Sequence, residues 1–226
     1  PGLVLVAEYQ TLGRGRLGRS WKAEPKSSLL ASVLIKPEID PELLGLLPIL
    51  SGIALVEAIE NIAGFKPGLI WPNDVFGAKG KIAGILVESI FENKCLKFLV
   101  IGSGVNLSQK KDDFPPEIRG RASSVFEETQ KLISRDELLF NYLEKIGHWL
   151  KVLEKGMPEE IVENYSEYDI IAGKEIKVLR DKDQIIGIAC GIDLKGRLKV
   201  KSKGKDFCLR AGEIRMVRGM SNAFGD

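Results

Sequence analysis

Apolar and polar positions alternate along the chain in two ways, and together they predict an α+β fold. Apolar runs over residues 3–9 and 29–35 are typical of strands. Two further runs, over residues 81–90 and 95–103, flank the polar segment 92–94 and predict two strands joined by a turn. These four runs place strands in the first part of the chain.

Helix signals stand between these predicted strands. Asp40 precedes Pro41, the arrangement of a helix cap followed by a proline in the first turn. Pro48 is expected to break or kink this helix. A second apolar helix is predicted over residues 49–63, with Gly64 as its end.

A longer helix is predicted to begin at the capping box Ser134-Arg135-Asp136-Glu137 and to end at Gly156. It carries His148, the only histidine, which we interpret as structural because the helix has a core stripe at helical spacing. Mechanisms that need a histidine base are thereby nearly excluded, which favours charge stabilisation by Lys and Arg. The expected core stripe consists of Leu139, Leu143, Ile146, Leu150 and Leu153.

The pattern changes after residue 170, where short alternating runs replace the helices. Tight turns separate these runs, which predicts a small β-barrel. We expect a catalytic domain over residues 1–170, a barrel domain over 171–219 and a fraying tail over 220–226. The five expected strands cover residues 175–179, 184–192, 198–201, 207–209 and 214–217.

Composition excludes several classes of protein. A formal charge of +2 over 226 residues is too small to indicate nucleic acid or an anionic membrane as the main partner. No apolar run of about eighteen residues is apparent, so we expect no membrane span. The three cysteines, Cys95, Cys190 and Cys208, lie far apart in strand-like contexts and are expected to be buried thiols of a cytoplasmic protein. They form no zinc-ligand pattern.

The most informative segment is residues 13–21, which reads Gly-Arg-Gly-Arg-Leu-Gly-Arg-Ser-Trp. Glycines let a backbone approach a phosphate closely, and arginines match phosphate oxygens with planar, permanently charged groups. Trp21 offers a flat face for a purine ring. The segment is short and unrepeated, which favours an ordered nucleotide-binding loop over a solvated loop or a nucleic-acid tether.

Two other clusters carry polar groups at strand ends. Trp71-Pro72-Asn73-Asp74 is followed by Lys81, which opens an apolar strand, and by Gly84, which leaves a gap on that strand. Alternatively, the first cluster is an ordinary turn and Lys81 a surface lysine. The third cluster, Gly102-Ser103-Gly104-Val105-Asn106, again allows a close backbone approach, although Gly-x-Gly is common in turns.

Taken in order along the chain, these segments resemble the biotin protein ligases, which adenylate biotin and transfer it to a carrier lysine. The family pattern includes the loop at residues 13–21, the Trp-Pro-Asn-Asp turn, the lysine strand and the Gly-x-Gly-x-Asn segment. Arg121-Ala122-Ser123-Ser124 and Gly212-Glu213-Ile214 resemble later family segments. The resemblance implies a mixed sheet backed by helices, as in class II aminoacyl-tRNA synthetases, and a small C-terminal barrel.

The resemblance also implies site residues. Three are expected to be catalytic: Lys81, Arg16 and Asp74. Those expected to bind biotin are Gln10, Gly13, Arg14, Arg16, Lys81, Gly84, Leu86, Gly102 and Gly104. Those expected to bind the nucleotide are Arg16, Arg19, Trp21, Asn73, Lys81 and Asn106.

The implied substrates are biotin and ATP, with Mg²⁺ arriving on ATP rather than on protein ligands. Arg16, Arg19 and Lys81 are expected to neutralise charge where the biotin carboxylate attacks the α-phosphorus. Asp74 is expected to orient or deprotonate the acceptor lysine, and the loop at residues 13–21 to act as a lid. The implied partner is the biotin carboxyl carrier protein of a biotin-dependent carboxylase. A homodimer is plausible, and neither a membrane nor specific DNA is expected.

The chain departs from the family pattern at three places. Ile70 stands where the family usually has a lysine before Trp-Pro-Asn-Asp, and residues 22–28 lack the usual Gly-Gly-x-Tyr. The sequence begins after the Ser-Thr segment that helps to enclose the biotin ureido ring, so we expect either a longer natural chain or weakened biotin binding. No winged-helix region is present, which leaves a repressor role without support.

Three alternatives remain open at this point. A lipoate ligase shares the fold but arranges its lysine and arginines differently. A nucleic-acid-binding module would use Arg14, Arg16 and Arg19 with Trp21, and its affinity would fall steeply with salt. An inactive scaffold would consume no ATP.

Overall fold

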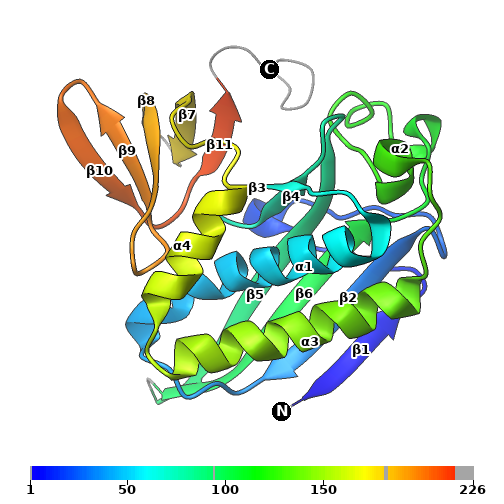
Figure 1. Cartoon of the computed structure of the whole chain (residues 1–226), viewed down its shortest axis with the longest axis horizontal. Helices are drawn as coiled ribbons and strands as arrows, with labels where there is room; N and C mark the ends of the chain where they lie inside the picture. Colours follow the sequence, from blue (N-terminus) through cyan, green and yellow to red (C-terminus); the bar gives the residue numbers. More distant parts are fainter. Residues whose placement is uncertain (1, 94, 181–182, 217–226) are drawn as a thin grey trace.

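The computed structural model describes residues 2–93, 95–180 and 183–216, and it consists of two antiparallel sheets with helices (Figure 1). The expected tail over residues 220–226 and the end of the last expected strand at Val217 lie outside the described residues. The predicted architecture, a sheet backed by helices followed by a small β region, is confirmed.

The first sheet has six strands in the order β1-β2-β6-β5-β4-β3. All its strand pairs are antiparallel, and parallel pairing is confined to single bridges at Leu69–Asp169 and Lys81–Ala122. The strands predicted at residues 3–9, 29–35, 81–90 and 95–103 all exist, the last two being longer than expected. The strands are β1 Leu3–Ala7, β2 Ser28–Ile35, β3 Gly68–Ile70, β4 Asp74–Phe76, β5 Lys81–Glu92 and β6 Cys95–Asn106.

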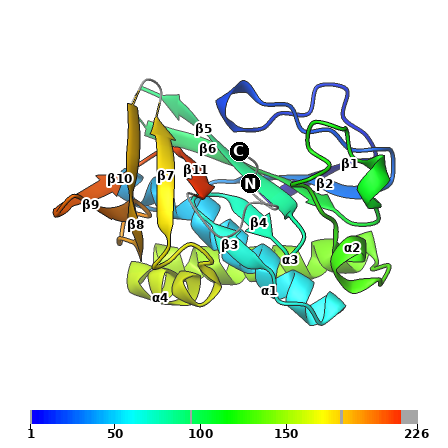
Figure 2. The same ribbon diagram turned by 90° about the horizontal axis from the view of Figure 1, so that it is seen from above.

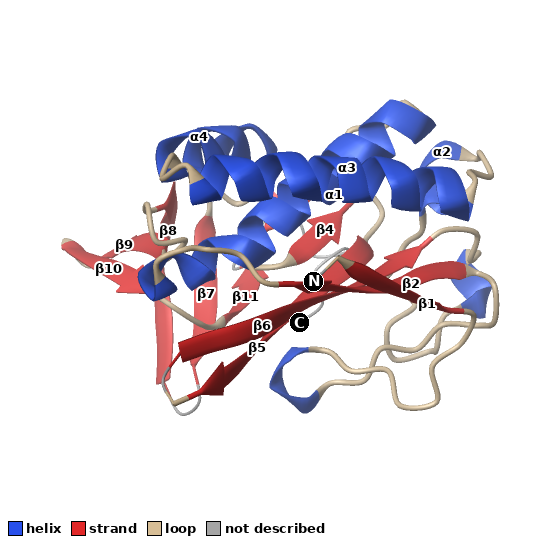
Figure 3. Cartoon of the chain, turned by 90° about the horizontal axis from the view of Figure 1, so that it is seen from below, coloured by secondary structure: helices blue, strands red, loops and turns tan. Residues whose placement is uncertain are grey.

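The helices cover one face of this sheet, and the long loop between β1 and β2 lies over the other face (Figures 2 and 3). This division leaves one face of β5 and β6 free of helices. The α-helices are α1 Leu47–Ala63, α2 Val125–Thr129, α3 Arg135–Glu154 and α4 Pro158–Tyr168. Three 3₁₀ turns are η1 Arg16–Gly18, η2 Pro41–Leu46 and η3 Lys111–Asp113.

Helix α1 is the buried centre of the fold. Asp40 caps η2 by accepting a hydrogen bond from the Glu42 backbone N–H at 2.8 Å, as its position predicts. The expected interruption near Pro48 is a change of helix type: the 3₁₀ turn η2 ends at Leu46 and α1 begins at Leu47, with Pro48 in its first turn, where the missing N–H costs no helical bond. Gly64 ends the helix in the left-handed conformation, with φ 65°.

The stretch Pro41–Ala63 also corrects the expectation that no apolar run is long enough to cross a membrane. By length and composition it passes that test, with a mean hydropathy of 1.9. In the fold, 67% of its most apolar window is buried. Its apolar surface is therefore used in packing against the sheet and α3.

Helix α3 begins at the predicted cap, where the Ser134 hydroxyl accepts from the Glu137 N–H. His148 is exposed on this helix and takes no part in the cleft described below. The predicted core stripe is right at Ile146 and Leu153. At the other three positions, Leu139, Leu143 and Leu150 are only partly buried, and the residue one position earlier is buried instead. The buried stripe of α3 consists of Leu138, Tyr142, Ile146, Trp149, Val152 and Leu153.

The second sheet contains the five predicted strands in the order β10-β9-β8-β7-β11. This antiparallel sheet agrees with the small C-terminal β domain that was expected; among the described residues no pairing joins β10 to β11. The expectation of buried thiols is wrong for Cys190 and Cys208, because strand alternation buries Ala189 and Leu209 and turns both cysteines outward. The strands are β7 Glu175–Arg180, β8 Asp183–Ile192, β9 Leu198–Ser202, β10 Lys205–Leu209 and β11 Glu213–Met216.

Candidate active site

Glycines form a flat area on the helix-free face of the first sheet. Gly84 on β5 lies directly opposite Gly104 on β6, and Leu86 lies opposite Gly102. Ser103, between the two β6 glycines, points to the other face, where its hydroxyl is 2.8 Å from the Tyr142 hydroxyl of α3. We call Gly84, Gly102 and Gly104 the glycine floor.

The Trp21 indole lies on the glycine floor. A Cβ built on Gly104 would come within 2.5 Å of Trp21 Cε2, and one on Gly84 within 3.3 Å of Trp21 Cζ3. The Lys81 ammonium is 5.9 Å from the centroid of the indole ring. The indole N–H is buried and has no hydrogen-bond partner among the described residues. An aromatic plane thus fits this surface only because the side chains beneath it are absent.

Backbone hydrogen bonds fold residues 13–21 into a compact loop that brings Trp21 to the floor. The Trp21 N–H donates to the Gly13 carbonyl at 2.9 Å, and the Gly15 N–H donates to the Arg19 carbonyl at 2.7 Å. A Cβ on Gly13 would collide with the Trp21 carbonyl oxygen. Gly13 therefore shapes the loop and, unlike the other predicted biotin-binding residues, does not line the cleft.

The three arginines of the loop have three different partners. Arg16 Nη1 donates to Asn73 Oδ1 at 3.0 Å, and burial lowers the pKa of Arg16 from its ordinary value. Arg14 forms an exposed ion pair with Glu88 at 3.0 Å. Arg19 pairs with Glu213 at the start of β11, and this hydrogen bond raises the pKa of Arg19 and lowers that of Glu213.

The Trp71–Asp74 turn, whose Trp71–Pro72 peptide bond is cis, supplies the opposite wall. Asn73 Nδ2 donates to the Ile85 carbonyl at 2.7 Å, and the Ile85 N–H donates to the Asn73 carbonyl at 3.0 Å. Asp74 Oδ1 accepts from Lys81 Nζ at 2.7 Å, with about one third of each side chain exposed. The turn therefore fixes the amide that holds Arg16 and the carboxylate that holds Lys81.

Asn106 closes the far end of the floor. It is buried, and its Nδ2 donates to the Ser123 carbonyl at 2.9 Å. Ser123 belongs to the segment 121–124, which pairs with the backbone of Lys81. The Lys81 N–H donates to the Arg121 carbonyl, and the Ser123 N–H donates to the Lys81 carbonyl. This contact joins two of the segments singled out in the sequence.

One cleft of about 530 Å³ unites these groups. It brings the loop at residues 13–21 and the strand that carries Lys81 to the same face, as the sequence interpretation requires. Every predicted site residue except Gly13 lines it: Gln10, Arg14, Arg16, Arg19, Trp21, Asn73, Asp74, Lys81, Gly84, Leu86, Gly102, Gly104 and Asn106. Their individual roles in binding and catalysis stay predictions.

Sequence reasoning missed several further lining residues. Ser32 lies opposite Gly102, so strand alternation could have identified it. Phe76 could have been found in the same way, from its place on β4. No pattern marked Phe114 and Ile118, which lie in an irregular segment. Glu213 was noticed only as part of a resembling segment, and its partnership with Arg19 was not predicted.

The electrostatics of the cleft favour anions. Its carboxylates are each paired with a cation: Asp74 with Lys81, Glu88 with Arg14 and Glu213 with Arg19. Among the described residues, no group of three or more His, Cys, Asp or Glu side chains is arranged so that it could hold a metal ion. Negative ligands with several oxygens can replace the internal carboxylates at these cations.

Comparison with known proteins agrees with this geometry. Residues 1–106 match the Biotin/lipoate A/B protein ligase family. The chain is 29% identical to the biotin–[acetyl-CoA-carboxylase] ligase of Mycobacterium tuberculosis, covering 96% of this chain and 80% of that protein. It is 28% identical to the bifunctional ligase/repressor BirA of Bacillus subtilis, where it spans only 62% of the relative's length.

A solved structure shows the same fold over nearly the whole chain. The biotin protein ligase from Aquifex aeolicus in complex with biotin and ATP superimposes with a TM-score of 0.83 at 31% identity. The match covers 96% of this chain and 89% of that one.

Proposed function

The chain belongs to the biotin protein ligase family, and from this premise we propose that it activates biotin with ATP to biotinyl-5′-AMP and transfers the biotinyl group to a lysine of a biotin carboxyl carrier protein. The single observation that carries the proposal is the shared cleft, in which the cations of the loop at residues 13–21 and Lys81 converge over the glycine floor.

In the first half-reaction two anions must meet. The biotin carboxylate oxygen attacks the α-phosphorus of ATP, a P–O bond forms, and pyrophosphate leaves. Arg16, Arg19 and Lys81 border the cleft and stabilise the charge that develops on the phosphorus oxygens. Mg²⁺ carried on ATP would supply further positive charge at the leaving pyrophosphate. Pairing with Asn73 and Asp74 keeps Arg16 and Lys81 oriented as the anions bind, whereas the more exposed Arg19 can exchange Glu213 for an anion.

The glycine floor suits the flat parts of the substrates. Without side chains at residues 84, 102 and 104, a flat ring can lie directly against the backbone of β5 and β6, as the Trp21 indole does at Gly84 and Gly104. A substrate ring on that part of the floor displaces the indole, which then covers the nucleotide and can donate its unpaired N–H to a substrate oxygen or nitrogen. Covering the mixed anhydride also excludes water, which would otherwise hydrolyse it.

In the second half-reaction the acceptor lysine attacks the activated carbonyl carbon. An N–C bond forms as the bond from the carbonyl carbon to the phosphate oxygen breaks and AMP leaves, and Asp74, which lines the cleft beside Lys81, accepts the proton that the amine loses. A second hollow of about 510 Å³ adjoins the cleft, shares Arg14, Arg16 and Asn73 with it, and follows β5 to Ser89. We assign the approach of the carrier lysine to this hollow.

Mass spectrometry tests the proposal directly. The protein is incubated with ATP, Mg²⁺ and biotin and examined for retained biotinyl-5′-AMP, and a carrier domain is then added. We expect the adenylate first and a biotinylated carrier lysine second. Pyrophosphate exchange that depends on lipoate and not on biotin would instead assign the chain to the lipoate ligases, and no ATP consumption with either acid would reject an adenylating function.

The remaining expectations accompany this proposal. We place the protein in the cytoplasm, with a catalytic unit over residues 1–170 and a smaller unit over 171–219. The free edge of β1 is compatible with a homodimer. DNA or RNA affinity that falls steeply with salt would argue for the nucleic-acid alternative.

A further inference from the structure

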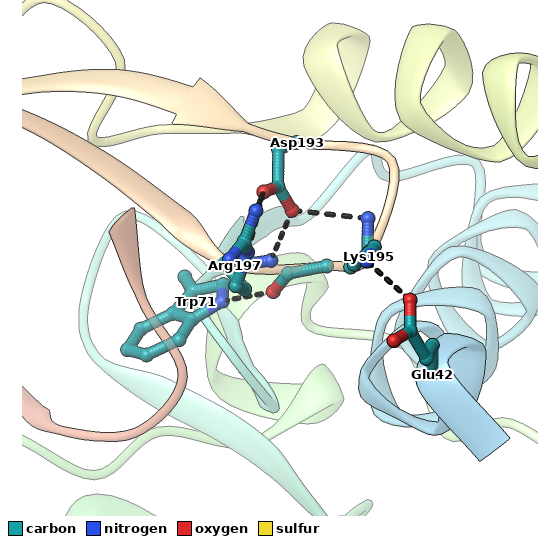
Figure 4. A network of polar contacts seen from close by, with 6 residues as sticks. Glu42, Trp71, Asp193, Lys195 and Arg197 are labelled. Atoms are coloured by element: carbon teal, nitrogen blue, oxygen red, sulfur yellow. Dashed lines mark hydrogen bonds and ion pairs between the residues drawn. The ribbon is translucent and has the colours of Figure 1, made fainter. Parts of the chain in front are cut away.

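The turn between β8 and β9 is built around Asp193. Its Oδ1 accepts hydrogen bonds from the backbone N–H groups of Lys195 at 3.0 Å and Arg197 at 2.9 Å, and its Oδ2 accepts from Arg197 Nε at 2.6 Å (Figure 4). These bonds fix the turn at residues 193–197 in one shape. The shape presents the carbonyl of Gly196 to the first sheet.

That carbonyl accepts a hydrogen bond from Trp71 Nε1 at 2.8 Å, across the boundary between the two sheets (Figure 4). Trp71 is only 2% exposed, so its indole N–H has no access to water as an alternative acceptor. The bond therefore ties the second sheet to the first residue of the Trp71–Asp74 turn.

Two glycines allow the backbones to come this close. Gly196 has φ +72°, and a Cβ on it would lie 2.5 Å from the Gly45 carbonyl oxygen. A Cβ on Gly45 would in turn collide with the Lys195 carbonyl oxygen. At the rim of this contact the Lys195 ammonium pairs with Glu42. The contact is thus shaped by backbone fit, with a peripheral ion pair.

The turn that Trp71 opens carries two groups of the cleft. Asn73 orients Arg16, and Asp74 orients Lys81. Gly196 itself lines the hollow that adjoins the cleft, together with Pro72 and Asn73. A displacement of the indole would therefore be transmitted to both cations within three residues of chain.

We infer that Gly196 is a positioning residue for adenylate formation: its carbonyl holds the Trp71 indole and thereby sets Asn73 and Asp74 against Arg16 and Lys81. The inference rests on the proposed function. Gly196 does not act on the substrates itself, so its effect falls on the rate of the chemical step, because that step depends most on the placement of the cations.

A pair of glycine variants isolates this role. Gly196→Ala and Gly204→Ala both introduce a Cβ at a positive φ on the second sheet, +72° and +75°, but nothing lies within 4 Å of the Cβ at residue 204. We expect Gly196→Ala to lower kcat for biotin-dependent pyrophosphate exchange by about tenfold or more with little change in KM for ATP. Gly204→Ala should keep the kcat of the unaltered protein. Equal kcat in the two variants overturns the inference.

A second variant and a spectroscopic signal cover the case in which Gly196→Ala fails to fold. Asp193→Asn leaves the backbone unstrained but weakens the turn, and it should lower kcat, whereas Lys195→Ala, which removes only the pair with Glu42, should not. The indole N–H resonance of Trp71 should shift in Asp193→Asn and stay in place in Lys195→Ala. An unmoved resonance with full kcat in Asp193→Asn contradicts the inference, whereas absent exchange in the unaltered protein contradicts the proposed function instead.

Discussion

Two segments meet at the cleft and are held in different ways. The Trp71–Asp74 turn is fixed by hydrogen bonds of buried or partly buried groups, from Trp71 to Gly196 and from Asn73 to Ile85. The loop at residues 13–21 is joined to the rest of the molecule by one part-buried hydrogen bond, from Arg16 to Asn73, and by the Trp21 indole on the glycine floor. Its other two side-chain links are the ion pairs Arg14–Glu88 and Arg19–Glu213, which are more exposed.

The physical consequence follows from what each kind of bond is worth. A buried donor that loses its partner costs about 1–3 kcal/mol, so the turn keeps one geometry. An exposed ion pair contributes about 0–1 kcal/mol, so an arriving anion can replace the carboxylate with little loss. The turn acts as a template, and the loop can exchange partners as substrates enter.

Removing the cation held by the template should have the largest effect. Lys81→Ala should lower kcat for adenylate formation by about a hundredfold to a thousandfold, because one preorganised charge next to the phosphorus is lost. ATP affinity, measured by calorimetry, should change far less. Lys97→Ala is the control, because Lys97 pairs with Glu92 on the same two strands away from the cleft. Equal turnover in Lys81→Ala would remove Lys81 from the chemistry.

Adding one carbon to the glycine floor should separate the loop from the sheet. In Gly104→Ala the new Cβ meets the Trp21 indole at 2.5 Å, so the indole must move. We expect unfolding in urea to show a loss of about 1–3 kcal/mol and Trp21 fluorescence to change. Gly120→Ala adds a Cβ with nothing within 4 Å and should do neither. Unaltered fluorescence in Gly104→Ala would show that the indole does not lie on the floor.

Substitution of Asn73 removes hydrogen bonds that fix the Trp71–Asp74 turn. Asn73→Ala removes the donor to the Ile85 carbonyl and the acceptor for Arg16, and the free energy of unfolding should fall by about 1–3 kcal/mol. If the comparison is right, this loss exceeds that of any single ion-pair variant of the loop. A smaller loss than in Glu213→Gln would reverse the comparison.

The smallest effect is expected at the loop pair. Glu213→Gln should lower the free energy of unfolding by less than about 1 kcal/mol at pH 7, because the pair is partly exposed. Arg19 lowers the pKa of Glu213 below 4.5, so the stabilisation is complete above that ordinary value and is lost as the pH falls through the lower folded value. Urea titrations should therefore converge for the two proteins in strong acid. A constant difference down to that pH would mean that the charge of Glu213 is irrelevant.

Local patterns were enough to predict most elements and the composition of the cleft. Alternation along β6 places Gly102 and Gly104 on one face without any knowledge of the fold, whereas Gly84 joins them only through the pairing of β5 with β6. The same rule predicts that Cys190 is exposed if its neighbour Ala189 is buried, as both are in the structure. The apolar residues around Cys190 favoured the opposite interpretation, a buried thiol.

Long-range partners could not be predicted in this way. Arg19 and Glu213 are 194 residues apart, and Trp71 and Gly196 are 125 apart. Nothing in the periodicity of either segment specifies which carboxylate or carbonyl will face it, because that depends on how the second sheet packs. The order of the five strands in that sheet is likewise a matter of strand pairing that alternation leaves undetermined.

The alternation of Gly102, Ser103 and Gly104 makes the two faces of β6 depend on one count of residues. A single-residue insertion before Gly102 that shifted the pairing with β5 would turn the hydroxyl of Ser103 toward the cleft. The Tyr142 hydroxyl would then face a glycine and lose its hydrogen-bond partner. The register between the bulge at Ile90/Phe91 and the glycine floor is therefore under a parity constraint: a shift of one residue exchanges the two faces of β6, and a shift of two restores the alternation.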